Sequence, residues 1–111
     1  MKKTIVCKLQ VEGVHQWAEC PFEEVKFLKN SHRHIFYINC EKEVCHNDRD
    51  IEFIMFKRKI IKYLNKKYSN GEYLEFNNMS CEMISIELMK EFELAKCEVF
   101  EDNENGAIIY A

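Results

Sequence analysis

The chain has 111 residues and a formal net charge of −3, with 47% hydrophobic and 32% charged residues. This length fits a single domain, residues 1–111, with one modest core. The charge balance argues against binding to nucleic-acid backbones, and no run approaches the roughly 18 apolar residues of a membrane-spanning helix.

The first predicted strand covers residues 4–12, where apolar and polar side chains alternate with the period-two pattern of a half-buried strand. Its apolar face carries Ile5, Cys7, Leu9 and Val11. Gly13 is expected to end this strand. Residues 15–31 contain the only proline and no clean period, which predicts a loop with a short helical turn at residues 22–28.

A second strand is predicted at residues 34–45, where one face carries His34, Phe36, Ile38, Cys40 and Val44. A helix is predicted at residues 51–68, with Asp50 as its N-cap. Its apolar stripe is formed by Phe53, Phe56, Ile60 and Leu64. Residues 69–78 are expected to be a loop that begins at the Asn70–Gly71 stop signal.

Ser80 is a cap candidate for a second helix at residues 81–92, and strands are predicted at residues 94–101 and 107–110. The expected order is therefore ββααββ. This order predicts an α+β fold in which a four-stranded antiparallel sheet carries two helices on one face. The sheet edges are candidates for pairing with another copy of the chain, so a homo-oligomer is expected.

Six cysteines are present, but no CxxC pair occurs and the first residues lack the apolar core of a signal peptide. The cysteines are therefore interpreted as reduced thiols of a cytoplasmic protein rather than as three disulfides. The missing CxxC pairs also argue against a structural zinc knuckle.

Two histidines, His32 and His34, flank Arg33 at the head of the second predicted strand. Residues two apart on a strand face the same side, and His15 follows the neighbouring strand. Three imidazoles with an open fourth position are typical of a catalytic-type zinc site. The alternative interpretation is that these are ordinary polar residues at strand ends.

Five segments resemble 6-pyruvoyl-tetrahydropterin synthases and 6-carboxytetrahydropterin synthases, which are T-fold proteins. The segments are HQW, SHRHIFYINCEKE, DIEFIMFKRKI, MSCEMISIEL and CEVFEDNENGAIIY, and the likeness in pattern and order spans residues 5–110. It implies that His15, His32 and His34 bind zinc, with Arg33 replacing the glycine of the family's H-G-H pair. It further implies that Glu101, and Glu82 of a segment resembling the family's T-S-E-N, face a pterin-like ring.

The sequence departs from that family at its catalytic groups. Leu28 stands where the family has its catalytic cysteine, four residues before the histidine pair. Residues 70–78 contain neither member of the family's Asp-His pair, and the remaining histidine, His46, precedes the first helix. Because proton transfer needs an acid and a base beside the reacting atom, no catalytic residue is assigned.

The other candidate ligand residues suit recognition of a nucleotide. Trp17 would stack on a ring, or else belong to the core. The cations would meet phosphate, or else be solvated surface groups; they are Arg33, Arg49, Lys57 and Arg58. Asn103 and Asn105 lie in a loop that would close over a ligand, or else form a simple hairpin turn.

A second similarity, in size, element order and missing catalytic groups, is to small phage proteins that counter the bacterial Thoeris defence. Those proteins hold cyclic ADP-ribose-type signals without cleaving them. The leading hypothesis is therefore a non-catalytic oligomer that sequesters a purine-containing nucleotide, in the host cytoplasm if the chain is phage-encoded. The alternatives are a zinc-dependent enzyme of the pterin or 7-deazaguanine pathways and an interaction module without a ligand.

Overall fold

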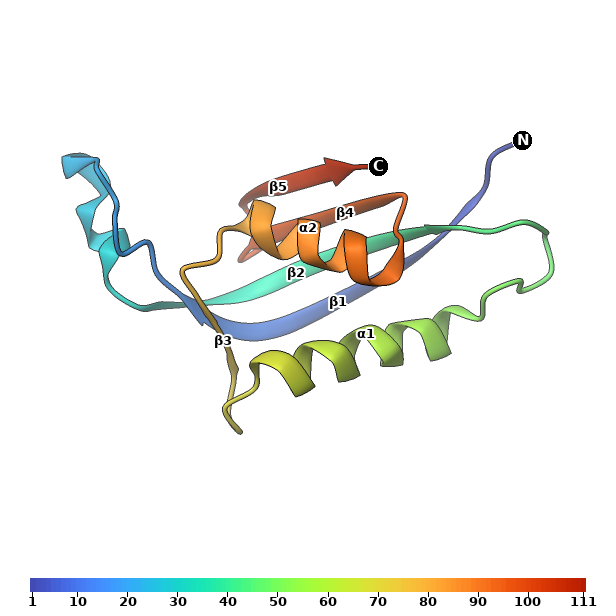
Figure 1. Ribbon diagram of the computed structural model, residues 1–111, viewed down its shortest axis with the longest axis horizontal. Coiled ribbons are helices and arrows are strands. Elements are labelled where there is room, and N and C mark those ends of the chain that lie inside the picture. The colour runs from blue at the N-terminus through green and yellow to red at the C-terminus, as the bar shows by residue number, and fades with distance from the viewer.

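A computed structural model describes all residues, 1–111, as one sheet covered on one face by two α-helices (Figure 1). In chain order the elements are β1 (Thr4–His15), the 3-10 helix η1 (Glu23–Lys29), β2 (His32–Glu43), α1 (Phe53–Tyr68), β3 (Leu74–Asn77), α2 (Cys81–Phe92), β4 (Lys96–Glu101) and β5 (Asn105–Tyr110). No helix among them is long and apolar enough to cross a membrane.

The sheet has five strands in the order β3-β1-β2-β4-β5, and it is mixed because β3 runs parallel to β1. The α+β class agrees with the sequence prediction, but the four-stranded, wholly antiparallel ββααββ sheet is wrong. The missing strand lies in the segment that was expected to be a loop. Leu74 and Phe76 are buried there in alternation, but four residues between turn signals are too few to reveal a period of two.

The sequence predicts that β1 ends at Gly13, but the strand continues to His15. The glycine is needed for a close approach instead. A Cβ atom at this position would lie 2.8 Å from Cε2 of Phe76 and 2.9 Å from the ring of Phe36. The absence of a side chain at Gly13 therefore allows the two phenylalanine rings to pack directly over β1.

The two α-helices share a single core with the inner face of the sheet. From α1 the buried side chains are Phe56, Ile60 and Leu64, and from α2 they are Cys81, Ile84, Ser85 and Leu88. Phe53, expected on the buried stripe, is 55% exposed. Ser80 caps α2 as predicted, but the cap of α1 is Glu52, whereas Asp50 accepts a hydrogen bond from the Cys45 N–H.

In the antiparallel pair of β1 and β2, the histidines lie on the same face of the sheet as the buried core residues. Cys7 faces Cys40, which in turn faces Cys97 of β4, and all three are buried. Further along the same pair of strands, Gly13 faces His34 and His15 faces His32. The last inward positions of the two central strands are therefore occupied by imidazoles.

Candidate metal centre and adjoining pocket

The three histidines meet at one end of the sheet. Each offers one ring nitrogen, and these three nitrogens lie within 4.8 Å of one another. His15 is buried, while His32 and His34 are partly buried. The edge of the Phe36 ring supports the cluster from the core side, with its centroid 5.2 Å from that of His15 and 5.7 Å from that of His34. The cluster therefore sits on top of the hydrophobic core.

Each imidazole uses its Nδ1 atom in a hydrogen bond to another group of the protein. Nδ1 of His15 lies 2.9 Å from the Met79 carbonyl, and Nδ1 of His32 lies 2.8 Å from the Asn30 carbonyl. A carbonyl only accepts, so Nδ1 must carry the proton and donate it. The lone pair of each neutral ring is then on Nε2, which is the arrangement that a metal ligand needs.

The Nδ1 atom of His34 lies 2.7 Å from Oδ2 of Asp102, the residue that follows β4. The other oxygen of Asp102 accepts from the Ile35 N–H at 3.0 Å, so the carboxylate is fixed at both ends. The hydrogen bond from His34 keeps the pKa of Asp102 below its ordinary value. Asp102 has φ = 54°, a left-handed conformation that aspartate tolerates better than most residues.

Glu101 faces the two histidine nitrogens that lack a hydrogen-bond partner. Its Oε2 lies 3.1 Å from Nε2 of His15, and its Oε1 lies 3.4 Å from Nε2 of His34. Both nitrogens are buried without a donor or acceptor in hydrogen-bonding geometry. With both Nδ1 atoms protonated, lone pairs would face lone pairs, so a proton or a metal cation is needed between them.

The contact between His15 and Glu101 shifts the pKa values of both residues. Burial alone would lower the pKa of His15, but its contacts with Glu101 and with the Met79 carbonyl outweigh burial and raise it. The close contact with His15 lowers the pKa of Glu101, against the opposing effect of burial. Both shifts favour the charged pair, in which Nε2 of His15 carries the proton and Glu101 is a carboxylate.

The donor set fits zinc. Three imidazole nitrogens and a carboxylate oxygen are ligands that Zn²⁺ takes in proteins, at about 2.0–2.2 Å. A cation would give the two unpartnered buried nitrogens the partner that buried polar atoms almost always have. The hydrogen bonds on the Nδ1 atoms supply the outer shell that orients such ligands.

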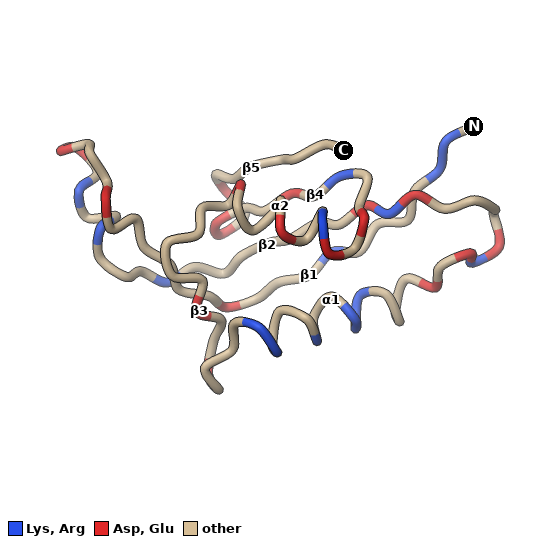
Figure 2. The backbone as a smooth tube through the Cα atoms, in the orientation of Figure 1, with Lys and Arg blue, Asp and Glu red and all other residues tan.

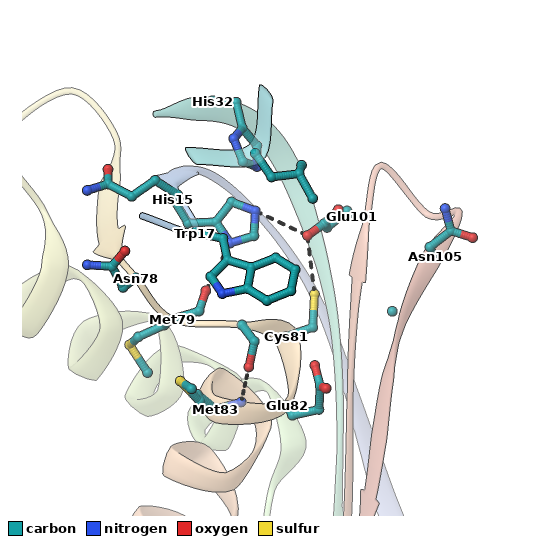
Figure 3. A pocket seen from close by; sticks show the side chains of 14 residues that line it. His15, Trp17, His32, Asn78, Met79, Cys81, Glu82, Met83, Glu101 and Asn105 are labelled. Carbon is teal, nitrogen blue, oxygen red and sulfur yellow. Dashed lines mark hydrogen bonds and ion pairs between the residues drawn. The ribbon is translucent and has the colours of Figure 1, made fainter. Parts of the chain in front are cut away.

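A cavity of about 470 Å³ opens beside the histidines, between the end of β1, the start of α2 and the β4–β5 hairpin (Figure 3). Its wall includes His15, Trp17, Glu82, Glu101 and Asn105. Figure 3 shows the Trp17 indole among these groups, and Trp17 is 42% exposed. No lysine or arginine lines the cavity.

Cys81, at the first position of α2, also lines this cavity. Its thiol donates to Oε2 of Glu101 at a distance of 3.7 Å. Burial, together with the neighbouring Glu101 carboxylate, raises the pKa of Cys81 to about 12. Cys81 is therefore a neutral thiol at physiological pH and not a ready nucleophile. Leu28, where the resembled family has its cysteine, lines the same cavity.

The basic residues that sequence reasoning assigned to phosphate lie outside this cavity. Arg33 is exposed and pairs with Glu12, and Arg49 pairs with Asp48 in the turn before α1. Lys57 and Arg58 lie on α1, whose sequence holds six lysines and arginines and no acidic residue. Blue segments along this helix are visible in Figure 2.

These two α1 residues line a separate groove with Val6 and Phe53. Asn103 lies in a third cavity, so of the two predicted asparagines only Asn105 reaches the pocket. His46 contacts Asp50 at 3.3 Å, in the segment between β2 and α1, and does not belong to the histidine cluster.

Sequence reasoning missed Asp102 and Cys81. A signal for Asp102 was present, because an acidic residue next to Glu101 at a hairpin turn faces the same strand end as His34. Comparison with protein-family models finds no match for this sequence, and comparison with curated proteins finds no significant relative.

Proposed function

We propose that this protein binds Zn²⁺ through His15, His32 and His34 and uses the adjoining cavity to hold a planar purine- or pterin-like ring without converting it. The observation that carries the proposal is the arrangement of the three imidazoles, in which every Nδ1 is within hydrogen-bonding distance of a protein acceptor. One ring nitrogen from each histidine lies within 4.8 Å of the other two. Hydrogen bonds from the ring nitrogens to outer acceptors are typical of metal-binding histidines.

The cavity wall supports a flat heterocycle with N–H donors. Glu82 and Glu101 provide carboxylate acceptors, and Asn105 provides an amide that can both donate and accept. The Trp17 indole offers a partly exposed aromatic face for stacking. Because no cationic side chain lines the cavity, the bound metal would be the group that accepts an anionic or electron-rich atom of the ligand.

Holding rather than turnover is favoured by the state of the titratable groups. Cys81 is the only thiol in the cavity wall, and its pKa of about 12 leaves it protonated. A purine-containing signal such as a cyclic ADP-ribose isomer, and a free pterin or 7-deazaguanine, are the ligand classes to test first.

The test combines metal analysis with ligand binding. Purified protein is expected to carry about one zinc per chain, and His32→Ala with His34→Ala should remove it, whereas the exposed His46→Ala should not. Calorimetric titration with a pterin, a 7-deazaguanine and cyclic ADP-ribose should give saturable binding by one class. Mass spectrometry after denaturation should return that compound unchanged.

Three results would overturn the proposal. Chemical conversion of the bound compound would make the protein an enzyme of the pterin or 7-deazaguanine type. Absence of zinc after expression in zinc-supplemented medium would remove the metal. Failure to bind any of the three ligand classes, together with self-association of the chain, would favour an interaction module.

A further inference from the structure

The side chain of Glu101 stands between the histidines and the cavity. Its two oxygens lie 3.1 Å and 3.4 Å from the unpartnered nitrogens of His15 and His34, and the residue also lines the cavity. Two ligand atoms on one tetrahedral zinc ion, each bonded at about 2.0–2.1 Å, are about 3.3 Å apart. The carboxylate oxygens are therefore spaced from these nitrogens as neighbours in one coordination shell would be.

We infer that Glu101 is the fourth ligand of the metal in the ligand-free protein, and that it leaves the metal when a ligand enters the cavity. The inference rests on the proposed zinc site. It assigns Glu101 a role beyond that of an acceptor for ring N–H groups, and it makes the resting centre a closed one with three imidazoles and one carboxylate. Closed four-ligand sites do not offer a free position to an incoming molecule.

The charges at the site require such a ligand. When Nε2 of His15 and Nε2 of His34 bind the metal, neither nitrogen is left as a hydrogen-bond partner for Glu101. The carboxylate then has only the Cys81 thiol, a weak donor at 3.7 Å, as a hydrogen-bond partner. No lysine or arginine lines the cavity, which leaves the metal as the cation for Glu101.

The same weak anchoring allows Glu101 to move. Its side chain is 31% exposed, whereas the neighbouring carboxylate of Asp102 is fixed by both His34 and Ile35. Glu101 can therefore exchange the metal for an N–H donor of a ring in the cavity by rotating its side chain. Ligand entry would open the fourth metal position at the moment when the carboxylate finds its new partner.

Cobalt substitution tests this inference without any need for activity. The visible absorption of protein-bound Co²⁺ reports the number and type of its ligands, and Co²⁺ commonly replaces Zn²⁺ in such sites. Glu101→Gln should weaken Co²⁺ and Zn²⁺ binding by at least tenfold and should change the Co²⁺ spectrum. The matched control is Glu98→Gln on the same strand, which contacts Asn39 and Lys96 instead of the histidines and should change neither.

Whichever of the three titrated compounds binds, the pterin, the 7-deazaguanine or cyclic ADP-ribose, should shift the Co²⁺ spectrum of the wild-type protein in the same direction as Glu101→Gln does. If Glu101→Gln binds Co²⁺ with wild-type affinity and spectrum, Glu101 is not a ligand and the inference fails, although the three-histidine site stands. If the wild-type protein shows no histidine-dependent Co²⁺ binding, the proposed zinc site itself fails. The folded state of each variant is checked by its circular dichroism spectrum and its melting temperature.

Discussion

Two polar clusters of this molecule contain acidic groups of similar burial but differ in how completely they are paired. Between α1 and α2, Glu87 accepts from the hydroxyls of Tyr63 and Tyr68 and forms an ion pair with Lys67 at 3.1 Å. At the end of the sheet, Glu101 faces two buried histidine nitrogens that have no partner. The first cluster is complete within the chain, whereas the second leaves two buried nitrogens without a hydrogen-bond partner.

The difference distinguishes a polar network that is complete by itself from the proposed metal site. Although burial opposes it, hydrogen bonding from Tyr68 and Lys67 lowers the pKa of Glu87, and burial together with Glu87 raises the pKa of Tyr68. Both shifts keep the cluster in a single protonation state, carboxylate with hydroxyl, across the physiological range. The proposed metal site has no such single state, because a proton and a metal ion would compete for Nε2 of His15.

Removal of the metal from the histidine cluster should have the largest effect on stability. With free zinc at a hundred times its dissociation constant, binding adds about 2.7 kcal/mol to the free energy of unfolding. A chelator should therefore lower the melting temperature of the zinc-loaded protein by roughly 10 °C. Differential scanning calorimetry measures this shift, and an equal shift in His34→Ala would contradict a histidine-bound metal.

Asp102→Asn should come next in size. The amide cannot replace the charge that orients the His34 ring, so zinc affinity should fall about 10- to 100-fold, as for other outer-shell partners of metal-binding histidines. Competition with a colorimetric zinc chelator measures the affinity. Because Asn also tolerates the left-handed backbone at this position, the melting temperature of the metal-free protein should change little.

Glu87→Gln should lower stability without changing zinc affinity, which is the reverse of the effect expected for Asp102→Asn. Loss of the charge-assisted hydrogen bonds from the two tyrosines should lower the free energy of unfolding by about 1–2 kcal/mol, while zinc affinity stays the same. Urea denaturation and the same chelator competition give both values. A variant that lost zinc as well would show that the two clusters are coupled, and the contrast between them would fail.

The pH dependence of the metal-free protein should give the smallest effect. The contact with Glu101 raises the pKa of His15 above 6.5, so its stabilising contribution is complete below pH 6.5 and is lost as the pH rises through the raised value. The same contact lowers the pKa of Glu101 below 4.5, so the contribution is lost as the pH falls through the lowered value.

The pair should therefore stabilise the metal-free protein most between about pH 4.5 and 6.5. Urea denaturation of the chelated protein from pH 3 to pH 9 should show this maximum, and Glu101→Gln should flatten it. Zinc should abolish the alkaline decline, since the metal replaces the proton on the ring nitrogen. If the free energy of unfolding of Glu101→Gln still declined at alkaline pH, the decline would come from another group.

Much of the site could be predicted because strand periodicity places side chains reliably. A period of two puts His32 and His34 on one face, and the antiparallel return brings His15 beside them. The same reasoning failed for the basic residues. Charge alone predicts that Arg33 or Arg58 meets an anion, but it does not predict which cavity, if any, the side chain reaches.

The sheet was predicted incompletely for a related reason. β3 has only four residues, and it is stabilised by the packing of Phe76, whose ring is fully buried against Phe36. Such a strand exists because of tertiary packing rather than local preference, so its sequence looks like a loop. The role of Asp102 was hidden similarly, since its partner His34 is 68 residues away along the chain.

The histidines occupy the final inward positions of the stripes that form the core. His15 continues the phase of Cys7 and Leu9, and His34 continues that of Phe36 and Ile38. A one-residue insertion between Leu9 and His15 would turn the imidazole to the opposite face, unless the core residues were displaced instead. A change of length in either central strand would therefore disturb the core and the histidine cluster together, whereas a substitution of one histidine would change the cluster alone.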